Sequence, residues 1–444
     1  MKSYSRVGVK MSDEGRGVSG IVGHAPGITV AIGEGGSLSG DQFKIRGFDS
    51  KDDVDIDGLP AADVSRGLSG ALRQTRERAM FGRNPEGGVE AQVLEDLAAV
   101  VPRLLSALES AAFVARYLHP PNLRDVISAV GEPEAPLISA RRRLDAWPDD
   151  LADVRDRLAA ACDAAMAAFE GLRAAAGTGE VRAAYRALGQ LPRAQEQLYP
   201  LCRLLPPINR FFLPPACRED TALLARLAAA EPRADTGVIH LQSEPGQRGG
   251  VSLYIPETYD PTVACPLVFA LHGGSGNGRA FLWSWLRDAR ARGAILAAPT
   301  AIGETWAITG PDPDTPNLAR MLSGIRDNWN VDPDRLLLTG MSDGGTFSYV
   351  SGLEPGSPFT HLAPVSAAFH PMLAQMADPN RIAGLPIHVA HGSLDWMFPV
   401  TMARDAVQAL TAAGARVTWR EIEDLSHTYP RELNAGLLAW LDAA

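Results

Sequence analysis

Residues 335–345 read RLLLTGMSDGG, in which an apolar run leads through a Gly-x-Ser-x-Gly pattern into a segment of helical composition. The run 335–339 is typical of a buried strand. A serine on so tight a strand-to-helix turn is forced into unusual backbone angles, and Gly340 and Gly344 leave room for the close approach that results. The helix N-terminus places N–H dipoles near its hydroxyl. The context therefore predicts that Ser342 is a nucleophile.

Short apolar runs alternate with helical patterns on both sides of this turn, from about residue 235 to the end of the chain. This alternation predicts an α/β fold with a mostly parallel sheet covered on both faces. We expect GVIHLQ and VSLYIP to form two antiparallel leading strands. The expected core strands are PLVFALHG, AILAAPT, RLLLTG, HLAPVSA, PIHVAHG and VTWREIE, with helices at about 279–292, 316–329, 344–352, 400–413 and 429–442.

A glycine-rich turn, LHGGSG at residues 271–276, follows the first expected core strand. Acyl transfer creates a negatively charged oxygen that needs preorganised N–H donors. We expect the N–H of Gly274, with that of Ser275 as the alternative, to form this oxyanion hole with the N–H of Asp343. We expect His272 to orient the loop through hydrogen bonds rather than to act as the base.

The acid and the base are expected to follow the serine in the order Ser, Asp, His. Asp395 follows the strand PIHVA, and His427 follows VTWREIE in a polar loop that leads into the last helix. These positions predict Asp395 as the acid and His427 as the base. Asp424 is too close in sequence to His427 to lie naturally opposite it. The other histidines of this region lie beside strands or in glycine turns and are given no such role: His361, His370, His388 and His391.

The four segments LHGGSGNG, GMSDGG, HGSLDWMFPV and LSHTYP together resemble the phospholipase/carboxylesterase group of the α/β-hydrolase superfamily, and are similar also to polyhydroxybutyrate depolymerase-like and feruloyl-type esterases. The resemblance covers roughly residues 236–444. It implies the α/β-hydrolase fold for these residues, and the helical region that precedes them is a departure, because many single-domain relatives lack it. It also implies Ser342, Asp395 and His427 as the triad, and Gly274 and Asp343 as oxyanion donors. The Gly-Ser of the oxyanion loop is a departure at a position where these enzymes vary.

These residues predict a serine esterase that works through an acyl-enzyme and needs no metal or organic cofactor. A peptidase or an acyltransferase would use the same triad, and a catalytically silent scaffold would keep the fold alone. Trp306, in the loop after a core strand, and Trp396, beside the expected acid, are candidate walls of a substrate pocket, with ordinary packing as the alternative. Met397 and Phe398 share that status, and Ser275 is a further candidate.

The length and the net charge of the chain limit how many domains and which classes of partner we expect. At 444 residues the chain exceeds what one hydrophobic core usually serves, and a formal net charge of −10 argues against a broad basic face for nucleic acid. No stretch approaches the roughly 18 consecutive apolar residues of a membrane span, and no secretory signal is recognisable. We therefore expect a cytoplasmic protein acting on a small-molecule ester, with its oligomeric state left open. We expect the four separated cysteines to be buried free thiols.

Composition along the chain suggests three parts. Residues 1–87 form a glycine-rich leader that holds all four lysines and that we expect to be irregular; its GEGG lacks the context of a phosphate loop. Residues 88–234 have helical periodicity, and residues 235–444 form the hydrolase domain. Pro102 is expected to kink or divide one helix. The proline-interrupted run at 204–219 is expected to be irregular and to dock on the hydrolase domain, with a lining role at the active site as the alternative.

Overall fold

The computed structural model describes residues 24–25, 28–29 and 87–443. Most of the expected leader, including GEGG, lies outside the described residues. The two short described segments are strands β1 (His24–Ala25) and β2 (Ile28–Thr29), which pair antiparallel. Contacts divide the chain into two compact units, Met1–Asp52 and Asp53–Ala444. The helical and hydrolase regions both lie within the second unit, and their division at residue 234 stays a proposal.

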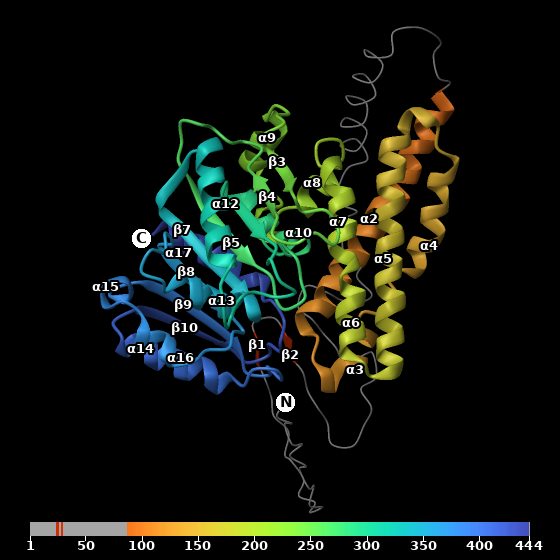
Figure 1. The fold of residues 1–444 in the computed structure, drawn as a ribbon. Helices are drawn as coiled ribbons and strands as arrows, with labels where there is room; N and C mark the ends of the chain where they lie inside the picture. Colours follow the sequence, from red (N-terminus) through yellow and green to blue (C-terminus); the bar gives the residue numbers. More distant parts are fainter. Residues whose placement is uncertain (1–23, 26–27, 30–86, 444) are drawn as a thin grey trace, which may run out of the picture. The chain divides into compact units, whose positions relative to one another are not determined.

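Eight strands of the second unit form one sheet in the order β10-β9-β8-β7-β5-β6-β4-β3 (Figure 1). β3 pairs antiparallel with β4 and β4 antiparallel with β6, whereas all other neighbours are parallel. The predicted strands, including the antiparallel leading pair, are therefore confirmed. Their bounds are β3 Gly237–Leu241, β4 Val251–Ile255, β5 Cys265–Leu271, β6 Ile295–Pro299, β7 Val331–Met341, β8 His361–Val365, β9 Pro386–Gly392 and β10 Arg416–Ile422.

Helices cover both faces of this sheet, as the continuous apolar strands predicted. In β5, Val268 packs into one hydrophobic cluster with α11 and α17, whereas its neighbour Phe269 packs into another with α12 and α16. This alternation follows from the two-residue period of a strand. The helices of this region are α10 Gly278–Phe281, α11 Leu286–Arg292, α12 Asp314–Asn328, α13 Asp343–Gly352, α14 Met372–Met376, α15 Pro379–Ile382, α16 Val400–Ala412 and α17 Asn434–Asp442, with short 3₁₀ turns η7 Leu282–Ser284 and η8 Arg431–Leu433.

Residues 87–229 are helical. The α-helices are α2 Gly87–Tyr117, α3 Leu123–Ala129, α4 Ala135–Arg141, α5 Ala152–Thr178, α6 Val181–Leu188, α7 Gln190–Leu198, α8 Pro206–Phe211 and α9 Thr221–Ala229, joined in part by 3₁₀ turns η2 Pro120–Asn122, η3 Arg142–Ala146, η4 Asp149–Leu151, η5 Tyr199–Leu201 and η6 Pro215–Cys217. Pro102 lies inside the uninterrupted helix α2, so the expectation that it divides the helix is wrong. Val101 and Leu105 beside it are buried, and this packing offsets the lost backbone hydrogen bond.

The proline-interrupted run is more regular than its prolines suggested. Pro206 and Pro207 occupy the first two positions of α8, where a helix has no intrahelical acceptor for an N–H and a fixed φ is favourable. The expectation of irregular structure is therefore wrong for this turn of helix. Phe212, at the end of α8, is fully buried and packs against Trp283 with ring centroids 5.8 Å apart. The run thus lies against the hydrolase region.

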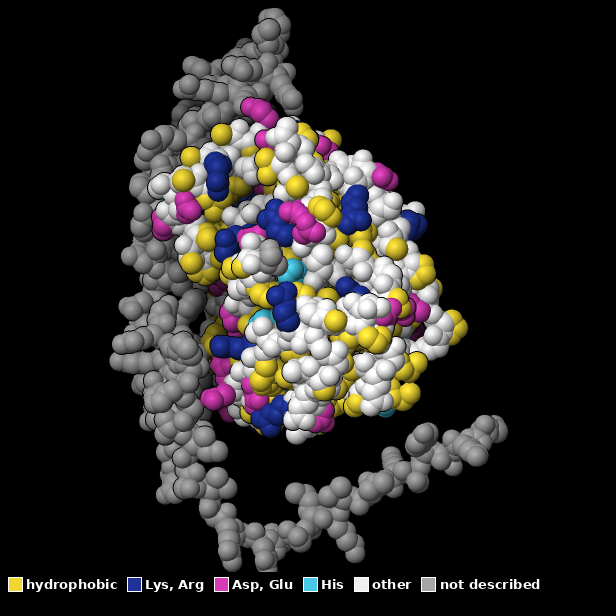
Figure 2. All heavy atoms as spheres, turned by 90° about the vertical axis from the view of Figure 1, so that its left-hand side faces the viewer, with side chains coloured by type: hydrophobic (Ala, Val, Ile, Leu, Met, Phe, Trp, Pro, Cys, Tyr) yellow, Lys and Arg dark blue, Asp and Glu magenta, His cyan; other side chains and the backbone are white. Residues whose placement is uncertain are grey.

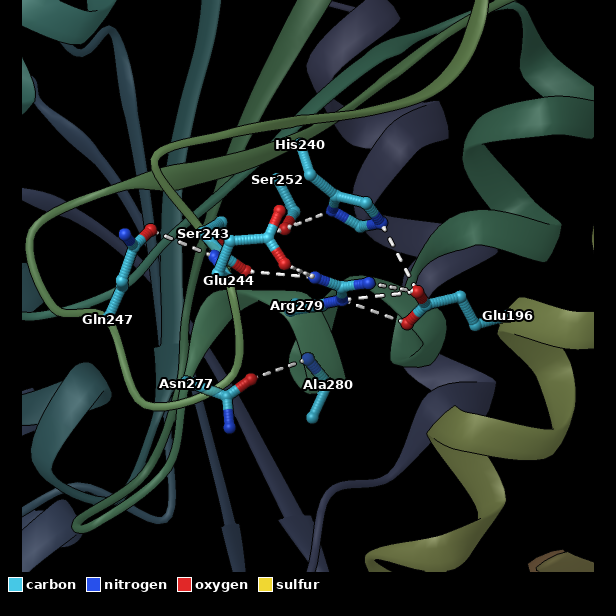
Figure 3. Close-up of polar contacts among 9 residues, drawn as sticks. All are labelled: Glu196, His240, Ser243, Glu244, Gln247, Ser252, Asn277, Arg279 and Ala280. Atoms are coloured by element: carbon cyan, nitrogen blue, oxygen red, sulfur yellow. Dashed lines mark hydrogen bonds and ion pairs between the residues drawn. The ribbon is translucent and has the colours of Figure 1, made fainter.

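The helical and hydrolase regions also share polar contacts. Arg290 of α11 donates to the Asn209 carbonyl at 3.0 Å and pairs with Glu257, which accepts from Tyr199 at 2.7 Å. Glu196 of α7 pairs with Arg279 of α10, as Figure 3 shows. Figure 3 also shows that the Arg279 guanidinium donates to the carbonyl of Ser243, a residue in the loop between strands β3 and β4. The donor and acceptor atoms are 3.2 Å apart. Arginine forks of this kind fix the orientation of the groups they join.

Within the described part of the chain, one helix segment is long and apolar enough to cross a membrane, Ala91–Tyr117 of α2. It meets the criterion although no uninterrupted apolar run of that length exists. The core helix of a soluble protein passes the same test, and 56% of the segment's apolar window is buried in the protein. On the face drawn in Figure 2, basic and acidic side chains are interspersed rather than gathered by sign.

Three of the four cysteines, Cys162, Cys202 and Cys265, are buried free thiols, as predicted. Cys217 is also free but partly exposed. Burial raises the pKa of Cys162 and Cys202 to about 12, so neither forms a reactive thiolate near neutral pH.

A chain cut at about residue 234 is expected to keep the hydrolase sheet but to become less stable or less soluble. The cut removes the cover of Trp283 and Tyr254, whose rings lie within 6.4 Å of Tyr199 or Phe212. Exposed apolar area costs about 25 cal/mol per Å². Melting temperature, solubility and ester turnover of residues 235–444 and of the full chain check this. Unchanged values for the fragment would show that the helices are an independent module.

Candidate active site

Four loops meet at the carboxyl edge of the parallel strands. They follow β5, β7, β9 and β10, and they carry Gly274, Ser342, Asp395 and His427 in that order. Because parallel strands end at one edge of a sheet, residues far apart in sequence converge there. Gly392 and Leu425 mark this convergence, since a Cβ on Gly392 would lie 2.1 Å from the Leu425 carbonyl oxygen. The loops that carry Asp395 and His427 are therefore in direct contact.

Ser342 lies between β7 and α13 with φ 57° and ψ −121°, a strained conformation for a residue with a side chain. The flanking glycines make this turn possible. A Cβ on Gly340 would lie 2.4 Å from the Gly344 carbonyl carbon, and one on Gly344 would lie 2.5 Å from the His272 carbonyl oxygen. No side chain fits at either position without moving the backbone.

Ser342, His427 and Asp395 form one chain of hydrogen bonds. His427 Nε2 lies 2.9 Å from Ser342 Oγ, and His427 Nδ1 lies 2.8 Å from Asp395 Oδ2. Burial raises the pKa of Asp395, but the hydrogen bond and charge of His427 outweigh it, so the pKa is lowered and the carboxylate is ionised at neutral pH. An ionised carboxylate only accepts, so Nδ1 of His427 carries the proton that it donates. Nε2 is then free to accept the serine proton.

Asp395 is held by more than His427. Its Oδ1 accepts the backbone N–H groups of Met397 at 2.9 Å and Phe398 at 2.8 Å. His391 Nε2 lies 2.8 Å from the Phe398 carbonyl and 3.4 Å from Asp395 Oδ2. The carbonyl needs a donor, so Nε2 of His391 is protonated and contributes a second positive dipole to the acid. The sequence analysis gives His391 no role. Its spacing of four residues from Asp395 in HGSLD is the sequence feature that could have indicated this contact.

The glycine-rich loop at 271–276, the expected oxyanion loop, passes directly beside Ser342. A Cβ on Gly273 would lie 3.5 Å from Ser342 Cβ, and one on Gly274 would lie 2.7 Å from Asp343 Oδ2. Asp343 is the first residue of α13, so its N–H has no acceptor within the helix and stays available to a ligand. Ser275 has φ 58°, which turns the loop sharply after Gly274. Whether Gly274 or Ser275 supplies the second donor stays a prediction.

His272 supports this loop, as expected. Its Nε2 accepts the Ala301 N–H at 3.1 Å, so its Nδ1 carries the proton that it donates to the Gly273 carbonyl at 2.7 Å. Burial lowers the pKa of His272 to about 4, which keeps the ring neutral. Trp306 is 3% exposed and donates through Nε1 to the His272 carbonyl at 2.8 Å. These contacts favour the packing alternative for Trp306.

Three large apolar side chains follow Asp395 in the sequence: Trp396, Met397 and Phe398. Trp396 is 42% exposed, and Met397 beside it is 47% exposed, so both are accessible to an apolar substrate. Phe398 packs edge-on against the His427 ring, with centroids 5.3 Å apart. In the described ranges, no three His, Cys, Asp or Glu side chains are grouped so that they would hold a metal ion.

Sequence reasoning missed a group of helical-region residues that contact the base loop. Tyr185, on α6, donates its hydroxyl proton to the His427 carbonyl at 2.7 Å. Arg116, near the end of α2, pairs with Asp424 at 2.9 Å, and His119 Nδ1 lies 3.0 Å from Ser426 Oγ. These partners are separated by more than 240 residues in the sequence, and no motif links them. Asp424 is thus engaged by arginine rather than by the base.

Part of this chain matches a known family. Residues 317–438 match the model of the phospholipase/carboxylesterase family. The resemblance inferred from the four sequence motifs is therefore confirmed over that segment, which includes Ser342, Asp395 and His427. The α/β-hydrolase fold with a mostly parallel sheet, expected from that resemblance, agrees with the sheet order described above.

Individual relatives were also found. The chain is 31% identical over 155 residues to feruloyl esterase C of Emericella nidulans, a match that covers 33% of this chain and 55% of that protein. The chain thus spans about half the length of the curated relative it matches. Among solved structures, a thermostable esterase has a TM-score of 0.39 at 21% identity, covering 47% of this chain and 63% of that one. An esterase from the archaeon Pyrobaculum calidifontis has a TM-score of 0.38 at 16% identity, covering 50% and 90%.

Proposed function

We propose that the protein is a serine esterase that hydrolyses carboxylic esters through an acyl-enzyme on Ser342. The observation that carries this proposal is the chain of hydrogen bonds from Ser342 Oγ through His427 to the ionised Asp395. The strained turn at Ser342 and the free N–H at the start of α13 support it. Each is a part that acyl transfer requires.

The proposed reaction has two halves. His427 Nε2 takes the proton of Ser342 Oγ as the oxygen attacks the carbonyl carbon, and the resulting oxyanion accepts the N–H groups of Asp343 and of Gly274 or Ser275. Asp395 stabilises the imidazolium that forms. The imidazolium then gives its proton to the departing alkoxide oxygen, which leaves as an alcohol. In the second half, His427 takes a proton from water as the water oxygen attacks the acyl carbonyl carbon. The bond between Ser342 Oγ and the acyl carbon then breaks, the imidazolium returns its proton to Ser342 Oγ, and the carboxylic acid is released.

The substrate class is proposed as a neutral ester with an apolar or aromatic acyl group. Trp396 and Met397 are exposed beside the acid, and the partial likeness to a feruloyl esterase supports an aromatic acid as one test case. Both side chains offer apolar contact area. Among residues 87–443, no arginine is hydrogen-bonded to the side chains of Ser342, His427 or Asp395, which fits an uncharged carbonyl substrate.

Ester substrates are expected to be turned over far faster than amides of the same acid. p-Nitrophenyl butyrate and butyryl p-nitroanilide form a matched pair, and we expect kcat/KM to favour the ester by at least about 10²-fold. The amide is slower because its amine is a poor leaving group that must be protonated before it departs, and a site that hydrolyses esters need not supply that proton. Methyl ferulate tests the aromatic acyl group.

Each alternative activity gives a different result in the same assay. Faster cleavage of a proline-containing peptide anilide than of the ester would show a peptidase. Transfer of butyrate to added glycerol in preference to water would show an acyltransferase. Absence of turnover together with absence of fluorophosphonate labelling at Ser342 would overturn the proposal and leave the silent scaffold.

A further inference from the structure

The segment 424–432, which carries His427, is held on one side by the helical region. Arg116 lies in the last turn of α2, His119 precedes η2, and Tyr185 lies in the middle of α6. All three contact this segment. From the hydrolase region, the backbone N–H of Leu394 donates to the Leu425 carbonyl at 3.0 Å, and that of Ser393 donates at 2.9 Å to the carbonyl of Ile422, just before the segment.

Arg116 contacts one residue before and one residue after His427 in the sequence. Its Nη2 lies 2.9 Å from Asp424 Oδ1, before His427, and its Nε lies 2.5 Å from Glu432 Oε1, after His427. Its backbone carbonyl also accepts the Thr428 hydroxyl at 3.0 Å. A guanidinium that joins two carboxylates restrains both ends of a loop, because its donors are fixed in one plane.

Tyr185 acts on the catalytic residue itself. Its hydroxyl donates to the His427 carbonyl at 2.7 Å. Burial raises the pKa of Tyr185 to about 12, although a hydrogen bond with Trp396 acts to lower that pKa. The hydroxyl therefore keeps its proton. His119 adds a contact to the neighbouring Ser426, which is fully buried. Residues 426–428 are thus held by groups from the helical region, through the His427 carbonyl and the side-chain hydroxyls of Ser426 and Thr428.

We propose that the helical region positions the catalytic base, with Tyr185 and Arg116 as the positioning residues. The inference rests on the proposed esterase function. Proton transfer from Ser342 requires that His427 Nε2 stay within hydrogen-bond reach of Oγ, as it is at 2.9 Å. A loop that moves by about 1 Å loses much of the rate, since misplacement of this size costs up to about 10²-fold.

The helical region also supplies a matched control. Tyr199, in η5, donates its hydroxyl to Glu257 at 2.7 Å, the same length as the bond from Tyr185 to His427. Glu257 also accepts from Tyr254 at 2.6 Å and pairs with Arg290, and none of these residues lies in segment 424–432. Tyr199→Phe and Tyr185→Phe therefore each remove a tyrosine hydroxyl that donates from the helical region to the hydrolase region. Only the Tyr185 hydroxyl donates to the base, in addition to its hydrogen bond with Trp396.

The test compares Tyr185→Phe, Arg116→Met, Arg116→Lys and Tyr199→Phe in the full chain. Measurements are kcat and KM for p-nitrophenyl butyrate, the fluorophosphonate labelling rate at Ser342, hydrogen exchange of residues 424–432, and melting temperature. We expect Tyr185→Phe and Arg116→Met each to lower kcat and labelling by about 10-fold with KM within about twofold. Hydrogen exchange of the segment should speed up. Arg116→Lys, which keeps the cation, should recover part of the loss.

Tyr199→Phe is expected to lower the melting temperature by an amount similar to Tyr185→Phe while leaving kcat within about twofold of wild type. The positioning role is overturned if Tyr185→Phe and Arg116→Met keep wild-type kcat and labelling, or if Tyr199→Phe loses as much as they do. A wild-type protein that neither hydrolyses esters nor reacts with fluorophosphonate overturns the esterase proposal instead, and the positioning role with it.

Discussion

Ser342→Ala is expected to abolish ester hydrolysis and fluorophosphonate labelling while the protein stays folded. In the proposed reaction the Ser342 hydroxyl becomes acylated, and among the described residues Ser342 Oγ is the hydrogen-bond partner of His427 Nε2, at 2.9 Å. Loss of a nucleophile from a working triad costs about 10⁶-fold in kcat. Turnover of p-nitrophenyl butyrate and stoichiometric labelling followed by mass spectrometry measure this directly.

Ser348→Ala is the matched control for this change. Ser348 is also buried on α13, but its hydroxyl donates to the Gly345 carbonyl at 2.6 Å rather than facing His427. We expect Ser348→Ala to keep activity within a factor of about 3, because a single local hydrogen bond contributes about 1 kcal/mol to stability and nothing to the reaction. Continued labelling of the Ser342→Ala protein at the active site would refute Ser342 as the nucleophile.

His427→Ala is expected to be nearly as damaging as loss of the serine, and Asp395→Asn to reduce kcat by about 10⁴-fold. The reason lies in the contacts of the acid. Oδ1 of Asp395 accepts two backbone N–H groups, so an asparagine keeps its oxygen there and turns its NH₂ toward His427 Nδ1. The ring is then driven to carry its proton on Nε2, where it cannot accept the serine proton.

The pH dependence follows from the same contacts. Only the neutral imidazole accepts the serine proton, so kcat/KM is expected to rise with pH as the base loses its proton. The lowered pKa of Asp395 means that the acid stays ionised across this range and adds no second step there. The rise should therefore be a single ionisation, measured in kcat/KM from about pH 5 to pH 9.

Glu421→Gln is the control for Asp395→Asn, because it removes a nearby negative charge without removing the proposed acid. Glu421 lies on β10, the strand that leads into the base loop, and pairs with Arg404 and Ser393 rather than with His427. It is expected to keep wild-type kcat. Full activity of Asp395→Asn would show that another carboxylate orients the base.

The architecture of the hydrolase region could be predicted because its signals are local. Each strand is a short apolar run whose residues alternate between two covered faces, as Val268 and Phe269 do in β5. Ser342 was recognisable because a strand, a glycine-flanked serine and a helix occur in immediate succession. The positions of Asp395 and His427 after the last two strands follow from the rule that loops at the carboxyl ends of parallel strands converge.

Some local signals pointed the wrong way because tertiary packing outweighed them. Pro102 is expected to kink or divide its helix; it does not divide α2, and Val101 and Leu105 near it are buried. The proline pair at 206–207 was read as an interruption, and it begins α8 instead. The preference of one residue is worth a few kcal/mol at most, and the burial of several apolar side chains exceeds it.

The sequence by itself determined the sheet, the strained serine turn and the order of the three residues that the structure brings together, because each depends on the pattern within one short segment. Only the tertiary structure decided that Trp306 is buried beneath the oxyanion loop and that His391 lies against the acid. It alone decided that Arg116 and Tyr185 hold the segment around His427. Those contacts join residues hundreds of positions apart, and their formation depends on how the packed helices and the sheet meet in space, which no local pattern encodes.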